Sequence, residues 1–584
     1  MKKIIITLII LSSLISVVQA EKTVFPEESN EVIKSYRRGF QTLNGEEGYT
    51  ETTFGKAVTD RSSVSYIRID WKTVNPQEGV YKWDIIERAI TASKKFNQTV
   101  GVCFMPVGVN SASNYAQSTP DWVFDKGMKY TTEFDGALKV PVWDDPIFMQ
   151  EFKRFIEALA DKYDGNPDIA YFDTSNYGNW GEWHNWGLEN SEDISLEKLN
   201  EHVDMWSVFK KTLVLMVTNG KKNTLYGAAQ HGLDAHRFGI RRNGTVNPSQ
   251  PFDHQSLALA YDKVPAVAEW WFSYSQFTRR GVWEEITFEN VLRQSRPSIM
   301  AISQWDEDYF VDEEHELLDR WINRVGYWLK PIKITYPDNL VAGSNEKISF
   351  LIKNDGLAPF YPNRENIGYV KLALIDSKNN ITDTVLLDGI NPYNWKPEAF
   401  VNEAASFKFD SDTSDKRLAI GIFSDLDIDS PNVQMGIKAE RVDNWYILDS
   451  MTELESPDIA DNKVYKASDE YAEFGYGYHE ARYAFDKDDK TTWLARITGE
   501  GAWLEIDFGE EREFSTAFML PVGSEIKSYK IQTYSGGVWK DVHSGNAISR
   551  SGDFVHFEKQ TSKKVRILIT EGNEVVGLAQ FKIF

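Results

Sequence analysis

Short apolar segments alternate with amphipathic stretches from about residue 36 to residue 330. The apolar segments have the length and composition of buried strands, and the stretches between them have the apolar spacing of helices. Repeated strand-then-helix units predict a parallel sheet, and eight of them in this length predict a (β/α)8 TIM barrel. The expected strands are Arg38–Thr42, Ser65–Asp70, Thr99–Met105, Asp168–Thr174, Thr212–Thr218, His236–Ile240, Val264–Trp270 and Ile299–Trp305, and expected helices include Trp83–Phe96, Pro146–Tyr163 and Leu196–Lys210.

The pattern changes near Pro331, where strand alternation broken by Gly, Pro and Asn-Asp turns continues to about Leu448 without a clear helix. This is typical of a β-sandwich. A polar, acidic stretch follows, and the remainder again has an all-β pattern. The expected division is a signal peptide over 1–20, a catalytic barrel over 21–332, an Ig-like β-sandwich over 333–450, a linker over 451–462 and a second all-β domain over 463–584.

The N-terminal segment and the overall charge restrict the compartment and the partners. Lys2 and Lys3 precede an apolar run that ends at Ala20 with small residues, as in a secretory signal peptide. Cys103 is the only cysteine, so we expect neither intrachain disulfides nor a lipoprotein anchor, and we expect a periplasmic or secreted protein. The net charge of −23 disfavours binding to nucleic acid, and no later apolar run is long enough for a membrane anchor.

Two glutamates follow buried strands in aromatic surroundings. Glu182 lies in the sequence NYGNWGEWHNW after the fourth expected strand, and Glu269 lies in AEWWFSY at the end of the seventh. Aromatic faces stack on sugar rings, and a carboxyl group among indoles can have the raised pKa that a general acid needs. Two carboxylates at the carboxyl ends of barrel strands suggest glycoside hydrolysis. The alternative is that Glu182 is a solvated loop residue and Glu269 an ion-paired strand end.

The barrel resembles the clan of retaining glycosidases that includes the family 42 β-galactosidases. The resemblance rests on YIRIDWKTVNPQEGVYKWDIIERAI, TPDWVFDKG, GNWGEWH and the tryptophan of ISQWDED. It implies a retaining hydrolase of β-linked glycans, with β-galactosides as the favoured substrates, Glu182 as the acid/base and Glu269 as the nucleophile. The expected partner is therefore an oligosaccharide or polysaccharide. Two alternatives stay open, a non-catalytic glycan-binding protein with a degenerate cleft and a transglycosylase.

One departure from the clan concerns the residue before the acid/base. The clan has Asn there, where it bonds the sugar 2-hydroxyl, whereas this chain has Gly181. Asn179 or Asn176 in the same loop are the expected substitutes, and Asp173 is a less favoured alternative carboxylate. The resemblance also implies that Arg68 on the second strand orients the nucleophile through a charge-assisted bond, and the alternative is a structural ion pair. The remaining expected substrate-binding residues are Trp180, Trp183, His184, Trp271 and Trp305.

Other kinds of catalytic site find little support in the sequence. His231 and His236 are five residues apart rather than four, and the chain has no HExxH motif, nucleotide-binding glycine loop or GxSxG elbow. We therefore expect no cofactor for catalysis. Cys103 lies within an apolar strand and is expected to be an inert packing residue.

The C-terminal part resembles the coagulation factor 5/8 type C, or discoidin-like, fold, which family 32 carbohydrate-binding modules share. The resemblance rests on ARYAFDKDDKTTWLAR and GAWLEIDFGEEREFSTAFML. It implies a structural calcium ion held by Asp486, Asp488 and Thr491, whose oxygen atoms suit Ca²⁺. Gln580, however, stands where the family usually has an acid. A sugar-binding loop is expected from Tyr471, Tyr476, Tyr478 and His479, and the alternative is a spacer domain without a binding role.

Overall fold

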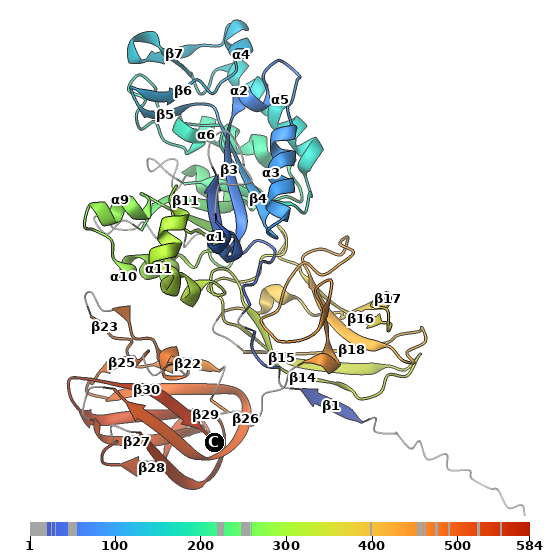
Figure 1. Ribbon diagram of the computed structural model, residues 1–584, viewed down its shortest axis with the longest axis vertical. Helices are drawn as coiled ribbons and strands as arrows, with labels where there is room; N and C mark the ends of the chain where they lie inside the picture. Colours follow the sequence, from blue (N-terminus) through green and yellow to red (C-terminus); the bar gives the residue numbers. More distant parts are fainter. Residues whose placement is uncertain are drawn as a thin grey trace, which may run out of the picture.

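The computed structural model describes three folded parts that follow one another along the chain (Figure 1). The expected signal peptide, apart from Ala20, lies outside the described residues, as do most of the expected linker and Tyr476. Described are residues 20–584 except 25, 30, 45–54, 219–226, 247–256, 258–259, 398–399, 452–458, 461–462, 474–476, 487, 489–490, 523–525 and 549–551.

The first part is a closed barrel in which the described residues form eight strands, each parallel to its neighbours. The predicted (β/α)8 barrel is therefore confirmed. The strands in barrel order are β2 (Gly39–Asn44), β3 (Ser62–Asp70), β4 (Thr99–Met105), β9 (Ile169–Asp173), β10 (Val214–Val217), β11 (Gly239–Thr245), β12 (Ala266–Trp270) and β13 (Ile299–Ala301).

Helices follow the strands because their apolar stripes pack against the outside of the sheet. The helix predicted over Pro146–Tyr163 has those bounds, since the Asp145 side chain caps its first turn and Pro146 occupies its first position. The main helices of the barrel are α1 (Lys56–Arg61), α2 (Trp71–Val74), α3 (Asp84–Lys94), α4 (Asp121–Asp125), α5 (Pro146–Tyr163), α6 (Leu196–Asp204), α7 (Ala229–His236), α9 (Tyr274–Arg279), α10 (Glu285–Ser295) and α11 (Glu307–Trp321).

The sixth barrel strand lies later in the chain than predicted. The expected range His236–Ile240 overlaps only the start of β11, because His236 is the last residue of α7. β11 instead continues to Thr245, with an irregular register against β12 between Arg242 and Thr245. Polar residues of the sequence RRNGT thus belong to the barrel wall.

The second part is a two-sheet sandwich, as expected, but it includes a strand from the N-terminus. One sheet has the order β1-β14-β15-β18, and β1 pairs with β14 in an antiparallel manner. The predicted boundary at residue 21 therefore differs from the structure, since the chain begins in the sandwich before it enters the barrel. The strands are β1 (Glu21–Val24), β14 (Leu329–Pro337), β15 (Glu346–Asn354) and β18 (Phe400–Phe407), facing β16 (Tyr369–Ile375), β17 (Ile381–Leu386), β19 (Arg417–Phe423), β20 (Arg441–Val442) and β21 (Trp445–Ile447).

The third part is a curled antiparallel sheet of the discoidin type, called the C-terminal module below. The long strands β26 and β29 pair with each other and with further strands at their two ends. Its own apolar core includes Trp493, Leu504 and Phe581. The strands of the curled sheet are β22 (Val464–Ala467), β25 (Trp493–Arg496), β26 (Ala502–Pro521), β27 (Ile526–Ser535), β28 (Val538–Gly545), β29 (Asp553–Gly572) and β30 (Val575–Ile583), and β23 (Ala472–Glu473) and β24 (Gly477–Tyr478) form a separate two-stranded sheet.

The C-terminal module contacts the other two parts. Glu480 of the module forms ion pairs with Arg293 of α10 and with Arg324, which follows α11. Lys353 of β15 donates a hydrogen bond to the carbonyl of Lys463, and Lys333 of β14 lies 3.0 Å from Glu510. In Figure 1 the module accordingly lies next to α10 and beside the sheet of β14 and β15.

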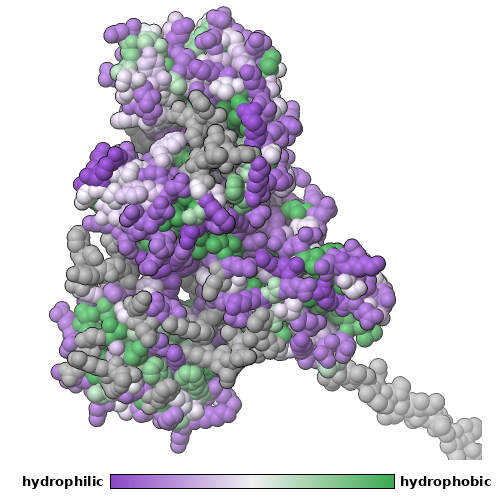
Figure 2. Space-filling model, viewed as in Figure 1, coloured by the Kyte–Doolittle hydropathy of each residue, from purple (hydrophilic) through white to green (hydrophobic). Residues whose placement is uncertain are grey.

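The coloured part of the face seen in Figure 2 is mainly hydrophilic, in keeping with the acidic composition. Figure 2 shows small, separate apolar areas on the visible face rather than one broad apolar patch. No helix among the described residues is long and apolar enough to cross a membrane.

Candidate active site

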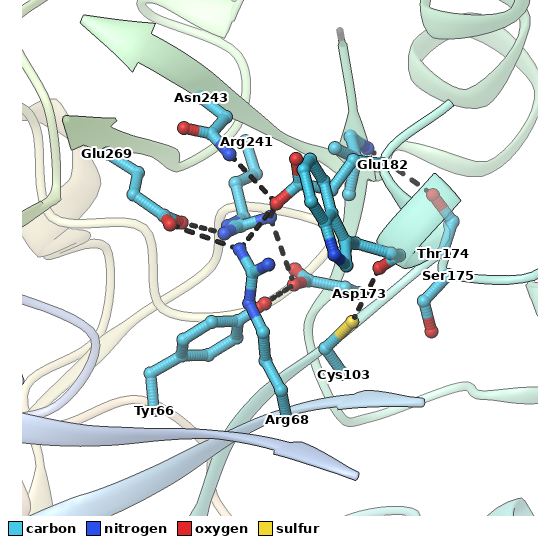
Figure 3. A network of polar contacts seen from close by, with 12 residues as sticks. Tyr66, Arg68, Cys103, Asp173, Thr174, Ser175, Glu182, Arg241, Asn243 and Glu269 are labelled. Carbon is cyan, nitrogen blue, oxygen red and sulfur yellow. Dashed lines mark hydrogen bonds and ion pairs between the residues drawn. The ribbon is translucent and has the colours of Figure 1, made fainter. Parts of the chain in front are cut away.

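Two arginines and three carboxylates form a buried polar cluster at the carboxyl ends of the barrel strands (Figure 3). Glu182 follows β9 in a loop that contains a short 3-10 turn, and Glu269 lies on β12. Both side chains are buried, with 2% and 1% of the residue surface exposed. The structure therefore brings the two predicted carboxylates together, although they are 87 positions apart in sequence.

Arg68 of β3 joins the two glutamates. Its Nη2 atom contacts Oε1 of Glu182 and lies 3.1 Å from Oε1 of Glu269. Because one nitrogen contacts both carboxylates, the nearest oxygen atoms of Glu182 and Glu269 lie close together. The predicted contact between Arg68 and Glu269 is present, and the contact with Glu182 was not expected from the sequence.

A second arginine, Arg241 of β11, lies on the other side of Glu269. Its Nη2 atom contacts Oε2 of Glu269, and its Nη1 atom lies 3.5 Å from Oδ2 of Asp173. The Tyr66 hydroxyl donates a hydrogen bond of 2.6 Å to the same Asp173 oxygen. Asp173 therefore belongs to the cluster, beneath the glutamate pair rather than in place of either member.

The electrostatics of Glu182 differ from the sequence expectation. Burial raises its pKa, but the charge of Arg68, a hydrogen bond from His184 and the charge of Arg241 lower it more, so the pKa lies well below its usual range. The expectation of a raised pKa is therefore wrong for the free protein. The neighbouring guanidinium outweighs the indoles, and Glu182 is ionised at neutral pH.

Asp173 shows the opposite behaviour. Burial raises its pKa despite the charge of Arg241 and the hydrogen bond from Tyr66. If all three carboxylates of the cluster were ionised, two guanidinium groups would leave one buried negative charge without compensation, which is costly. Asp173 accordingly binds a proton more readily than Glu182.

The local backbone explains why Gly181 replaces the expected Asn. Gly181 has φ +70°, and a Cβ atom there would lie 2.5 Å from the carbonyl oxygen of Ser175. Trp180 and Trp183 in the same loop also have positive φ, at 54° and 64°. Such strain is maintained only where surrounding contacts enforce it, and it is concentrated at functional sites.

The two expected substitutes for this Asn are used elsewhere. Asn179 bonds the backbone of Val109 and Trp186, and Asn176 bonds the carbonyl of His202 and the indole of Trp206. Both amides therefore hold the loop together, and the structure does not place Asn179 against the glutamate pair. Asn243 of β11 supplies the amide instead, donating a hydrogen bond of 2.8 Å to Oε1 of Glu182.

His184 lies beside the other oxygen of Glu182. Its Nε2 atom is 3.5 Å from Oε2 of Glu182, and its Nδ1 atom accepts a hydrogen bond from the amide of Trp186. A nitrogen that accepts from a backbone N–H carries no proton itself, so the remaining proton of a neutral ring is on Nε2. His184 is thereby oriented to donate towards Glu182.

The predicted tryptophan platforms differ in their exposure to solvent. Trp183 is fully buried, and its indole donates to the carbonyl of Thr174, so it is part of the wall. Trp180 is half-buried against His184. Trp271 and Trp305 are 43% and 49% exposed and offer free aromatic surface, as does Trp186, which was not predicted.

Sequence reasoning missed Arg241, Asn243, Tyr66 and Gln304. Gln304 lies 3.4 Å from Oε1 of Glu269 through its amide nitrogen. Arg241 and Asn243 were missed because the sixth strand was placed too early, and an Arg-Arg-Asn run resembles a solvated turn. A register continued to Thr245 would have pointed alternate residues, including Arg241 and Asn243, into the barrel.

Cys103 of β4 is buried beneath the loop, as expected. Burial raises the pKa of its thiol to about 11, so the thiol is protonated. Its sulfur lies 3.6 Å from the carbonyl oxygen of Trp180, which is consistent with a packing role.

In the C-terminal module the three expected calcium ligands lie in one loop. The Thr491 hydroxyl donates to Oδ2 of Asp486 at 2.6 Å, and the amide of Asp488 donates to Oδ1 of Asp486. Burial raises the pKa of Asp486, which means that its negative charge is not fully compensated. These oxygen donors fit a hard cation. Among the residues expected to form a sugar-binding loop, His479 forms a hydrogen bond with Thr492. The strand β24, which includes position 478, lies against α10 of the barrel.

Two parts of the chain match known families. Residues 56–189 match the beta-galactosidase family Glyco_hydro_42. Residues 465–581 match the F5/8 type C domain. Each match covers one part of the chain. Together they support a glycoside hydrolase acting on glycans, and the search of curated proteins found no relative of this chain.

Solved structures with a similar fold include carbohydrate-binding modules. A chitosan-binding module in complex with chitotriose, from the chitosanase/glucanase of Paenibacillus sp. IK-5, is 22% identical, covers 22% of this chain and 98% of its own, and has a TM-score of 0.20. The family 32 CBM of Clostridium perfringens NanJ in complex with galactose is 20% identical, with 20% and 90% coverage and a TM-score of 0.18. A family 89 glycoside hydrolase from Clostridium perfringens is 19% identical, with 22% and 14% coverage and a TM-score of 0.19. At these identities and TM-scores the likenesses carry no argument about the function of this chain.

Proposed function

We propose that this protein hydrolyses β-linked glycans with retention of anomeric configuration, with Glu269 as the nucleophile and Glu182 as the acid/base. The observation that carries the proposal is the contact of one Arg68 nitrogen with both carboxylates. Two hydrogen bonds from one nitrogen keep the nearest carboxylate oxygens within about 6 Å of each other. That is close to the ~5–5.5 Å of retaining enzymes and short of the ~6.5–9.5 Å of inverting ones.

The surroundings support Glu269 as the nucleophile. A nucleophilic carboxylate must be ionised and held in one orientation, and charge-assisted bonds to guanidinium groups provide both. Glu269 contacts Arg68 through one oxygen and Arg241 through the other. In the first step a Glu269 oxygen attacks the anomeric carbon while Glu182 protonates the departing glycosidic oxygen. In the second step Glu182 takes a proton from water, whose oxygen displaces Glu269.

Glu182 must acquire a proton before it can act as the acid. In the free protein it is ionised, because Arg68 lowers its pKa. We propose that a bound substrate excludes water and that Arg68 then keeps its contact with Glu269 but loses its contact with Glu182. Without that contact Glu182 can bind a proton. His184, whose Nε2 atom lies 3.5 Å from Glu182, is the neighbour best placed to share that proton.

β-Galactosides and related β-linked glycans are the proposed substrates. The support is the match of residues 56–189 to a family described as beta-galactosidase. Trp271 and Trp305 are exposed and are the proposed stacking surfaces for sugar rings. The C-terminal module is proposed to bind glycan and to hold calcium at Asp486, Asp488 and Thr491. We further propose that the protein is exported, on the strength of its N-terminal sequence.

One observation favours a second candidate, a non-catalytic glycan-binding protein. A general acid with a pKa lowered by a neighbouring Arg is unprotonated at neutral pH, which is unfavourable for catalysis. In that case the exposed tryptophans would bind sugar, and the ion-paired glutamates would serve only to stabilise the barrel.

Substitution of the nucleophile separates the two functions. Glu269→Ala should lower hydrolysis of an aryl β-galactoside by several orders of magnitude, and azide should partly restore turnover with formation of the α-glycosyl azide. Glu313→Ala, an exposed glutamate on α11, is the matched control and should keep the full rate. If wild-type protein binds the glycan but releases no sugar at any pH between 4 and 8, the protein is a non-catalytic glycan-binding protein and the proposed hydrolysis is wrong.

A further inference from the structure

A cluster of two histidines and one aspartate lies outside the polar cluster of the barrel. Asp204 is the last residue of α6, and His231 and His236 belong to α7. The Nε2 atoms of His231 and His236 lie 2.7 and 2.6 Å from the same oxygen of Asp204, Oδ1. Ligand atoms of the three side chains all lie within 4.8 Å of one another, the one group of three that meets this criterion in the described part of the chain.

The sequence spacing argued against this cluster, and the helix terminus explains why it forms. Five residues correspond to about 140° around a regular helix, so two such side chains should point apart. His236, however, is the last residue of α7, and Arg237 leaves the helix with φ 52°. Its ring can therefore turn towards His231, and the two rings lie 5.6 Å apart at 89°.

We propose that Asp204, His231 and His236 bind one divalent transition-metal ion of the zinc type. Two imidazole nitrogens with one carboxylate oxygen suit Zn²⁺, Co²⁺, Ni²⁺ and Cu²⁺ rather than Ca²⁺ or Mg²⁺, which prefer oxygen ligands. Metal bonds of ~2.0–2.2 Å would require ligand atoms about 3.3 Å apart in a tetrahedral site. The nitrogen–oxygen separations of 2.7 and 2.6 Å must therefore widen, and the two imidazole ligand nitrogens already lie within 4.8 Å of each other.

The exposure of the cluster suits such an ion. The side chains of Asp204, His231 and His236 are 50%, 29% and 19% exposed, so an ion can enter and complete its coordination with water. The site lies at the end of α7 that leads into the start of β11, whereas the glutamate pair lies near the other end of the strands. The ion therefore ties α6 to α7 and takes no part in the reaction at Glu182 and Glu269.

Zinc titration of the full chain, without a histidine tag, tests the proposal. Competition with a chromophoric chelator should show one bound Zn²⁺ per chain, and zinc added to the metal-depleted protein in the presence of saturating Ca²⁺ should raise its Tm. His231→Ala and His236→Ala should each weaken binding at least tenfold and remove the Tm increase. His315→Ala, an exposed histidine on α11, is the matched control and should change neither.

Copper gives a second readout that does not depend on stability. Bound Cu²⁺ should show hyperfine coupling to two imidazole nitrogens in its electron paramagnetic resonance spectrum, and each single variant should reduce this to one. Absence of a one-to-one site, or retention of wild-type zinc affinity in His236→Ala, would overturn the proposal.

Discussion

At the residue scale, the guanidinium of Arg68 controls both glutamates. It holds Glu269 in place, and its charge keeps Glu182 ionised in the free protein. Arg68 thus favours the ionised form that the proposed nucleophile needs and opposes the protonated form that the proposed acid needs. The effect of Arg68 on the ionisation of Glu182 can be measured, because the pH profile of kcat/KM reports the ionisation of groups in the free enzyme.

We predict that kcat/KM on an aryl β-galactoside is higher at acidic than at neutral pH. A lowered pKa means that the protonated form of Glu182 is populated only as the pH falls, so activity should decline as the pH rises. Arg68→Gln removes the cation, raises the pKa of Glu182 and should shift the declining limb to higher pH, even if the maximal rate falls. Arg61→Gln, at a surface ion pair with Asp319, should leave the limb in place. An unshifted limb in Arg68→Gln would contradict this role of Arg68.

Gly181 provides a second prediction at the residue scale. Gly181→Asn restores the residue that the clan has at this position, but its Cβ atom would meet the Ser175 carbonyl at 2.5 Å. We expect a loss of stability of about 1–3 kcal/mol together with a loss of activity. Gly79→Asn is the matched control, since Gly79 has φ +69° with no atom within 4 Å of an added Cβ. Calorimetry should show a lower Tm for Gly181→Asn than for Gly79→Asn, and equal values would exclude the steric account.

At the scale of elements, the regular parts of the barrel could be predicted and the irregular parts could not. The helix Pro146–Tyr163 and the strand Thr99–Met105 have clear periodicity and clear ends, and the structure has both with those bounds. β11 carries polar residues and an irregular register, so its sequence resembles a turn. Arg241 and Asn243 were missed for that reason. The pairing of β1 with β14 depends on a contact between distant segments, which local periodicity cannot reveal.

The candidate site was predictable to the extent that it follows from strand order. The carboxyl ends of parallel strands meet at one edge of the barrel, so Arg68, Glu182 and Glu269 could be grouped from the sequence. The direction in which the pKa of Glu182 is shifted could not be predicted from the sequence, because it depends on the distance between Arg68 and Glu182. The burial of Trp183 likewise depends on how the loop folds.

Glu480 tests the contact between the C-terminal module and the barrel. It is buried among Arg293, Arg324 and Arg482, so Glu480→Ala would leave three guanidinium groups near one another without their shared partner. Loss of one member of a buried ion pair costs about 3–5 kcal/mol. We expect a lower Tm and faster proteolysis between barrel and module. Glu511→Ala, at an exposed position on β26, should change neither, and equal effects of the two substitutions would mean that the contact contributes no stability.

At the scale of the whole molecule, the module is held against the barrel and the sandwich rather than attached by a linker alone. A fixed module would place a bound glycan at a defined position relative to the glutamate pair, whereas a flexible tether would only raise the local concentration of substrate. Contacts from Glu480, Lys353 and Lys333 support the fixed arrangement.

Calcium removal tests the proposed ion site of the module. An ion that binds only the folded state stabilises it by mass action, so Ca²⁺ added to the metal-depleted full chain should raise its Tm. Asp486→Asn should remove the response to calcium, because it deletes a charged oxygen ligand. Asp541→Asn, a partly exposed aspartate on β28 paired with Lys530, is the matched control. A calcium response that persists in Asp486→Asn would place the ion elsewhere.

The central claim is that Glu269 and Glu182 together cleave a glycosidic bond with retention. The most direct test is proton magnetic resonance of the sugar first released from an aryl β-galactoside by the wild-type protein, recorded before mutarotation. The geometry at Arg68 predicts that the β-anomer forms first. Initial release of the α-anomer would contradict the account, because it would require the two carboxylates to act on opposite faces of the sugar with a water molecule between them.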